Sequence, residues 1–115
     1  MQLALISADS DLARLRLSGR VTQESLAADA DPILDLLGAD GYGRRVLVDL
    51  SQAEFLDSSG VGWLLSCHKR FRQGQGRFIL HSIPPLVRRT LQVLRMELVL
   101  QLAKDVSEAE SMAQA

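Results

Sequence analysis

The feature that most constrains the fold is a short apolar run that leads into a helix in the middle of the chain. Residues 46–50 read Val-Leu-Val-Asp-Leu, which predicts a strand buried on both faces and bounded by Ser51. The chain then reaches Asp57-Ser58-Ser59-Gly60, which opens the clearest helical pattern in the sequence and is followed by a helix ending before Gly74. A buried strand that feeds a helix predicts a right-handed crossover and a mostly parallel α/β sheet.

The C-terminal part repeats this alternation more weakly. Residues 78–80, Phe-Ile-Leu, predict another short strand. Pro84-Pro85 predicts the start of a helix that runs to about Met96, because the fixed φ of proline suits a first helical turn. Residues 98–100 predict an edge strand, and residues 107–115 predict a weak terminal helix.

The N-terminal residues predict a β-hairpin. Residues 3–6 and 12–17 are apolar or alternating runs on either side of a polar turn at residues 7–11. The alternation of leucine with arginine in the second run predicts a strand with one solvated face. Gly19 is expected to end that strand.

Residues 22–37 have helical spacing that Pro32 interrupts, since proline removes a backbone donor inside a helix. Two structures remain open. One is a helix kinked near Asp29, and the other is a second, shorter helix capped by Asp31 with Pro32 at its first position. The whole pattern predicts the order β-β-α-β-α-β-α-(β)-α, a four- to five-stranded mixed sheet with about four helices, in a single domain over residues 1–115.

Composition narrows the class of function. The 115 residues carry a formal charge of −1, so no general attraction to nucleic acid or to an anionic membrane is expected. A lone cysteine, Cys67, forms no internal disulfide and suits a reducing compartment. No apolar run approaches the roughly 18 residues that cross a bilayer, and the start of the chain lacks the features of a signal peptide. We therefore expect a cytoplasmic protein without direct membrane insertion.

The start of the central helix is where chemistry is expected. Unpaired backbone N–H groups and the helix dipole favour negative charge there, so a phosphate on a serine would find donors in place. The competing interpretation is structural, because Asp and Ser are the usual residues that cap a helix. The four residues Asp57 to Gly60 alone favour the capping interpretation.

A longer sequence pattern around these four residues favours the phosphorylation interpretation over capping alone. The segment 46–65, Val-Leu-Val-Asp-Leu-Ser-x-Ala-x-Phe-Leu-Asp-Ser-Ser-Gly-Val-Gly-Trp-Leu-Leu, resembles the signature of STAS domains, the sulphate-transporter and anti-sigma factor antagonist family. Residues 17–21, 74–80 and 82–91 resemble the second strand, the fourth strand with its preceding loop, and the third helix of that family. The resemblance covers most of the chain in the same order, and it implies the STAS fold.

In the bacterial anti-sigma factor antagonist branch, the resemblance implies that Ser58 is phosphorylated, with Asp57, Ser59 and Gly60 around it. The implied kinase is the partner anti-sigma factor, and a serine/threonine phosphatase of the metal-dependent class restores the active form. Unphosphorylated protein would bind the anti-sigma factor and release a sigma factor. Many antagonists carry an acidic residue near the phosphorylation site where this chain has Thr22.

The helix after Ser58 has a wide apolar arc, most of which is expected to be core. Trp63 lies at one rim, and Val61 and Leu65 lie at the other. An exposed rim tryptophan would suit a partner contact, although ordinary packing is the simpler interpretation. Together with Arg20, which lies beside the phosphorylation site by the resemblance, these three are the candidates for partner binding.

Other functions have less support. Catalysis by Ser58 or Ser59 would need a nearby base, and the Gly-x-Ser-x-Gly elbow and the glycine-rich phosphate loop are absent from the sequence. His68 and His81 are too few for a metal site, and no cofactor is expected. STAS-like domains also act as unphosphorylated scaffolds or as subunits of signalling complexes and lipid or solute transport machinery, which is the alternative function. The predicted edge strand leaves a weak homodimer open.

Overall fold

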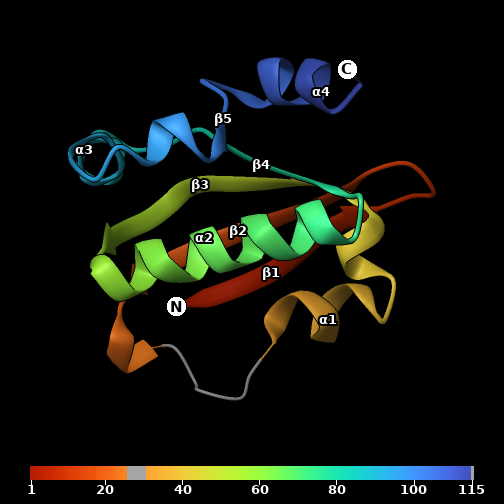
Figure 1. Cartoon of the computed structure of the whole chain (residues 1–115), viewed down its shortest axis with the longest axis horizontal. Coiled ribbons are helices and arrows are strands. Elements are labelled where there is room, and N and C mark those ends of the chain that lie inside the picture. Colours follow the sequence, from red (N-terminus) through yellow and green to blue (C-terminus); the bar gives the residue numbers. More distant parts are fainter. Residues whose placement is uncertain (26–30, 115) are drawn as a thin grey trace.

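The computed structural model describes residues 1–25 and 31–114, and it shows one mixed sheet with helices packed around it (Figure 1). The strands run in sequence order and are β1 (Gln2–Ala8), β2 (Ala13–Val21), β3 (Arg45–Leu56), β4 (Arg77–His81) and β5 (Gln101–Leu102). The α-helices are α1 (Pro32–Leu37), α2 (Ser58–Gln73), α3 (Pro85–Val93) and α4 (Val106–Gln114). Short 3-10 turns are η1 (Gln23–Ser25), η2 (Gly41–Gly43) and η3 (Met96–Leu98). The predicted fold class and element order are confirmed.

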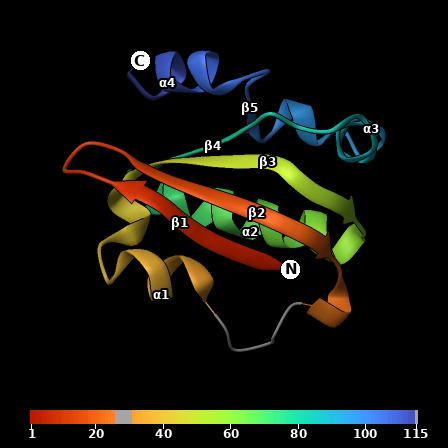
Figure 2. The ribbon, with the colours of Figure 1, turned by 180° about the vertical axis from the view of Figure 1, so that it is seen from behind.

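The core lies on both faces of β3 and β4. On one face Val46, Val48 and Leu80 pack in the same cluster as Leu64 and Phe71 of α2. On the other face a smaller cluster joins the two strands to α4, and it consists of Leu47, Ile79, Ala103, Ala109 and Ala113. Figure 2 shows α2 behind the sheet with α4 above it. Burial on both faces explains why the strand at residues 46–50 could be recognised from its continuous apolar run.

Strand β3 is longer than predicted. The prediction ended it at Ser51, but it continues to Leu56, pairing in parallel with β2. Its neighbour β4 pairs only with residues 45–49. In the outer half, Ala53 and Leu56 are buried while Ser51, Gln52 and Glu54 are exposed, so this half lacks the continuous apolar run on which the prediction depended.

The predicted hairpin of β1 and β2 is confirmed, but Gly19 does not end the second strand. Gly19 has φ +82°, which favours glycine, and the pairing with β3 shifts register between Gly19 and Arg20. The strand continues past this bulge to Val21, which pairs with Leu56. The bulge therefore carries β2 as far as the end of β3.

Of the two structures left open around Pro32, the short helix is confirmed. Asp31 caps α1 by accepting a hydrogen bond from the Leu34 N–H at 3.2 Å, and Pro32 is its first residue. The alternative kink near Asp29 lies outside the described residues. Asp31 also accepts hydrogen bonds from the Tyr42 hydroxyl at 2.8 Å and from Arg70 Nη1 at 2.9 Å, which ties α1 to α2.

The predictions for the C-terminal part were partly wrong. Helix α3 ends at Val93 rather than near Met96, and Arg95 has the left-handed φ of 58°. The edge strand is Gln101–Leu102 rather than residues 98–100, and Leu98 is 78% exposed in a 3-10 turn. The predicted terminal helix is present as α4. Among the described helices, none is both long and apolar enough to span a bilayer.

Candidate functional site

The junction of β3 and α2 is organised by the side chain of Asp57, the residue that precedes the helix. Asp57 Oδ1 accepts a hydrogen bond from the Gly60 N–H at 2.8 Å, and Oδ2 accepts one from the Gln23 N–H at 3.1 Å. These backbone hydrogen bonds, that of Gly60 foremost, lower the pKa of the Asp57 carboxyl. Asp57 is therefore ionised at neutral pH, and both of its oxygens are occupied.

Ser58, the predicted phosphorylation site, is the first residue of α2 and is exposed. Within the described part of the chain, its hydroxyl has no hydrogen-bond partner. Asp57 supplies the cap, so the capping role that the sequence left open between Asp and Ser falls to the aspartate. Ser59 follows in a half-buried position.

Gly60 allows the start of α2 to lie against the end of β2. A Cβ atom at Gly60 would sit 2.1 Å from the Val21 carbonyl oxygen. The same carbonyl accepts a hydrogen bond from the Asp57 N–H at 3.3 Å. Glycine is thus required at position 60 because the two backbones approach closely there. This approach fixes the start of α2 against the end of β2.

A pocket of about 300 Å³ opens next to Asp57. It is lined by residues from the end of β2, the η1 turn and the end of β3: Arg20, Thr22, Gln23, Glu24, Phe55 and Asp57. The Arg20 guanidinium lies over the Phe55 ring, 4.7 Å from its centroid. One arginine and two carboxylates therefore meet beside Ser58.

Thr22 is in this pocket, as the resemblance implied, but its backbone makes the local contacts. The Thr22 N–H donates to Ser25 Oγ at 2.9 Å, and that hydroxyl is also 2.9 Å from the Arg20 carbonyl oxygen. The sequence reasoning missed Gln23, Glu24 and Phe55 as site residues. Nothing in the sequence identifies Gln23, because it acts through its backbone N–H.

The four predicted partner-binding residues divide by exposure. Val61 is only 5% exposed and belongs to the core, so its side chain is not available to a partner. Trp63 and Leu65 are half-buried and pack against the core from outside, and Arg20 is exposed.

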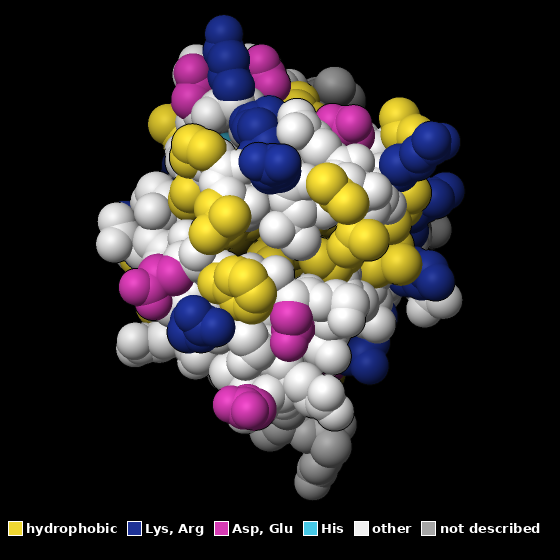
Figure 3. All heavy atoms as spheres, turned by 90° about the vertical axis from the view of Figure 1, so that its left-hand side faces the viewer, with side chains coloured by type: hydrophobic (Ala, Val, Ile, Leu, Met, Phe, Trp, Pro, Cys, Tyr) yellow, Lys and Arg dark blue, Asp and Glu magenta, His cyan; other side chains and the backbone are white. Residues whose placement is uncertain are grey.

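Hydrophobic side chains form a band across the end of the molecule where α2 and α3 begin, with basic and acidic side chains around it (Figure 3). Leu86, in the first turn of α3, is 58% exposed.

The histidines and the cysteine lie away from Ser58. His81 Nδ1 is 2.8 Å from Ser82 Oγ, and burial lowers the pKa of His81. Burial raises the pKa of the Cys67 thiol to about 12, which makes it a poor nucleophile. Within the described residues, no three His, Cys, Asp or Glu side chains are grouped to hold a metal ion.

The comparisons with known proteins bear on the family and the fold. A family model described as "Mlab, STAS domain" matches residues 5–102. A provisionally assigned anti-sigma factor antagonist from Thermotoga maritima has a crystal structure that aligns with TM-score 0.81 and 21% identity over 95% of this chain and 92% of that one.

Two further structures share the fold. A STAS domain protein from Planctomyces limnophilus, described as an anti-sigma-factor antagonist, aligns with TM-score 0.72 and 20% identity over 98% of each chain. The antagonist SpoIIAA in its unphosphorylated form aligns with TM-score 0.64 and 21% identity over 98% of this chain and 96% of that one. At these identities the structures establish the fold.

Proposed function

Since this chain belongs to the STAS domain family, we propose that it is a cytoplasmic anti-sigma factor antagonist controlled by phosphorylation of Ser58. In the unphosphorylated form it binds an anti-sigma factor that is also a serine kinase, and a sigma factor is released. Phosphorylation of Ser58 ends that binding, and a serine/threonine phosphatase of the metal-dependent class reverses it. The proposed role is binding rather than catalysis.

The observation that carries the proposal is the position of the Ser58 hydroxyl. It is exposed at the first residue of α2, and within the described residues it makes no hydrogen bond. Asp57 already caps the helix through Gly60, so modification of the serine costs the fold no contact. A kinase could therefore phosphorylate Ser58 in the folded protein.

Charge explains how the modification would act. A phosphate adds about −1.5 to −2 charges, and it would lie directly beside the ionised Asp57. A partner that covers this surface would have to desolvate both groups. A loss of only about 3 kcal/mol of binding free energy weakens binding more than a hundredfold. No movement of α2 is required.

The surface proposed for the partner surrounds Ser58. Trp63 and Leu65 offer half-buried apolar area on α2, and Arg20 with Phe55 offers a cation stacked on a ring. Tryptophan and arginine are the residues most enriched at binding hot spots. Leu86 extends this surface on α3, because β3 and β4 are parallel and deliver their following helices to the same edge of the sheet.

The test is phosphorylation by the candidate kinase with ATP, read by intact mass, together with partner binding. Wild type should gain one phosphate, about 80 Da for the added group. Ser58→Ala should gain none and bind, Ser58→Asp should fail to bind, and the neighbouring Ser59→Ala should behave as wild type. A phosphate gained by Ser58→Ala, or equal binding by all four proteins, contradicts the proposal.

A second function is favoured by the family model itself, which carries the description Mlab, and by Thr22 at the position where many antagonists are acidic. In that function the chain is an unphosphorylated STAS subunit of a signalling complex or of lipid or solute transport machinery. It predicts a stable complex with a co-encoded partner that ATP does not dissociate. Dissociation on incubation with ATP and the kinase would exclude it.

A further inference from the structure

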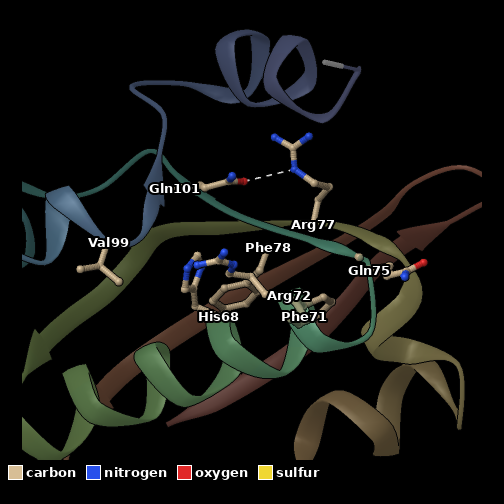
Figure 4. Close-up of a pocket in the computed structure, with 9 residues that line it drawn as sticks. His68, Phe71, Arg72, Gln75, Arg77, Phe78, Val99 and Gln101 are labelled. Atoms are coloured by element: carbon tan, nitrogen blue, oxygen red, sulfur yellow. Dashed lines mark hydrogen bonds between the residues drawn. The ribbon is translucent and has the colours of Figure 1, made fainter.

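A second pocket, of about 430 Å³, lies toward the other end of α2 (Figure 4). Its walls come from the second half of α2, the turn after it, the start of β4 and the segment leading into β5. It is lined by His68, Phe71, Arg72, Gln75, Gly76, Arg77, Phe78, Val99 and Gln101. A volume in this range suits a small organic ligand.

Two side chains of α2 give the pocket its chemistry. His68 is 7% exposed, and no hydrogen bond to its ring is found among the described residues. Arg72 lies four residues later on the same helix face, and within the described part of the chain its guanidinium makes no ion pair. Figure 4 shows both side chains extending from α2 toward the wall that holds Val99. Burial, and then the charge of Arg72, lowers the pKa of His68, so its ring is neutral at pH 7 and still carries one N–H donor.

The opposite wall supplies an oriented amide. Arg77 Nε donates a hydrogen bond to Gln101 Oε1 at 3.3 Å (Figure 4). Because the amide oxygen faces Arg77, the amide nitrogen of Gln101 remains as a donor. The pocket thus has donors on two walls: a guanidinium and an imidazole on α2, and an amide on β5.

No acidic residue is present among the described residues that line this pocket. A cation is therefore disfavoured, and an oxyanion would meet a guanidinium whose paired N–H groups match phosphate or carboxylate. Three donor groups match the three terminal oxygens of a phosphate monoester better than the two oxygens of a carboxylate. Apolar surface adjoins these donors. Val99 is 44% exposed, and the stacked rings of Phe71 and Phe78, whose centroids are 5.0 Å apart, also line the pocket.

We propose that this pocket binds a small phosphate monoester, with the phosphate on Arg72, His68 and Gln101 and the organic group against Val99. His68 lies ten residues beyond Ser58 on α2, or about 15 Å along a helix that rises 1.5 Å per residue. The site does not depend on the function proposed for Ser58, and it is tested without any partner.

The probe is phenyl phosphate, titrated into the 115-residue chain while the imidazole signals of His68 and the backbone amides are followed by NMR. Saturable shifts at His68, Arg72 and Gln101 are expected. Phenol, which lacks the phosphate, should bind at least tenfold more weakly, since it cannot form the charge-assisted hydrogen bonds that a phosphate forms with the guanidinium of Arg72. Phenol binding as well as phenyl phosphate overturns the proposal. If inorganic phosphate binds as tightly as phenyl phosphate, the organic group contributes nothing and the proposal of a phosphate monoester is overturned.

The matched variants are Arg72→Gln and Lys69→Gln, which remove one exposed positive charge each from α2. Arg72 lines the pocket and Lys69 does not. Arg72→Gln should weaken phenyl phosphate at least tenfold, and Lys69→Gln should change it less than twofold. Equal losses would mean that only net charge matters and would overturn the site. Because both positions are exposed, unchanged amide spectra of the free variants should confirm that each is folded.

Discussion

Asp57 Oδ2 accepts a hydrogen bond at 3.1 Å from the backbone N–H of Gln23, a residue 34 positions earlier in the chain. The other oxygen of the same carboxylate caps α2 through Gly60. One side chain therefore joins the turn after β2 to the start of the helix that bears Ser58. Removing the carboxylate would release both the helix start and the loop beside it.

Asp57→Ala should lower the midpoint of urea unfolding at pH 7, because it removes a helix cap and the contact with Gln23. Asp57→Ser keeps an oxygen that can cap the helix, so its midpoint should lie closer to that of wild type. A midpoint for Asp57→Ala equal to that of wild type would show that the cap is dispensable.

The stability that Asp57 adds should depend on pH. Its folded-state pKa lies below the unfolded value of about 3.9, so its contribution is complete above that pH. The contribution is lost as pH falls through the lowered folded-state pKa. The difference in urea midpoint between wild type and Asp57→Ala should be constant from pH 7 to about pH 5 and shrink at lower pH. A difference that grows on acidification would contradict this sign.

Gly60→Ala should destabilise the fold by about 1–3 kcal/mol, the usual range for forcing extra atoms into a packed site. The added methyl group would lie 2.1 Å from the Val21 carbonyl oxygen. Gly62→Ala is the control, because no atom lies within 4 Å of a Cβ there. Alanine replaces glycine on an exposed helix surface at that position, which should stabilise by about 0.5–1 kcal/mol. Denaturant unfolding measures both, and effects of the same sign would refute the close approach.

The hydroxyl of Tyr42 should lose its proton at a higher pH than that of an ordinary tyrosine. Burial, followed by the neighbouring Asp31 carboxylate, raises the pKa of Tyr42 to about 12, although its hydrogen bond with Arg70 opposes the shift. Tyr42 is the sole tyrosine, so its absorbance near 295 nm reports this group alone. The raised pKa adds stability that is complete below about pH 10 and is lost as pH rises toward 12. Asp31→Asn should shift the titration toward 10, and an ordinary midpoint in wild type would contradict the packing described.

Cys67 should resist thiol reagents in the folded protein. Burial raises its pKa to about 12, and the side chain is 3% exposed, so little thiolate exists at pH 8 and little of it is accessible. The reaction with Ellman's reagent should be much slower in buffer than in guanidinium chloride. Equal rates would place the thiol at the surface.

The sequence predicted those parts whose signals are local. Asp57 and Asp31 were among the candidate caps because a capping residue lies next to its helix, although the structure was needed to choose them over the alternatives. The edge strand was misplaced because Gln101–Leu102 has only two residues and carries no alternation. At the site, Gln23 and Phe55 were missed because a strand bulge after Gly19 brings their segments together. Such contacts between distant segments leave no periodicity in the sequence.

The unequal pairing along β3 predicts which part of the sheet opens most readily to solvent. Residues 52–56 pair with β2, but among the described strands none pairs with their other side, whereas residues 45–49 lie between two strands. Amide hydrogens should therefore exchange with solvent fastest near Leu56 and slowest near Val48. Transient opening at the outer end of β3 would leave the centre of the sheet closed, so the junction with α2 could open locally without unfolding of the domain.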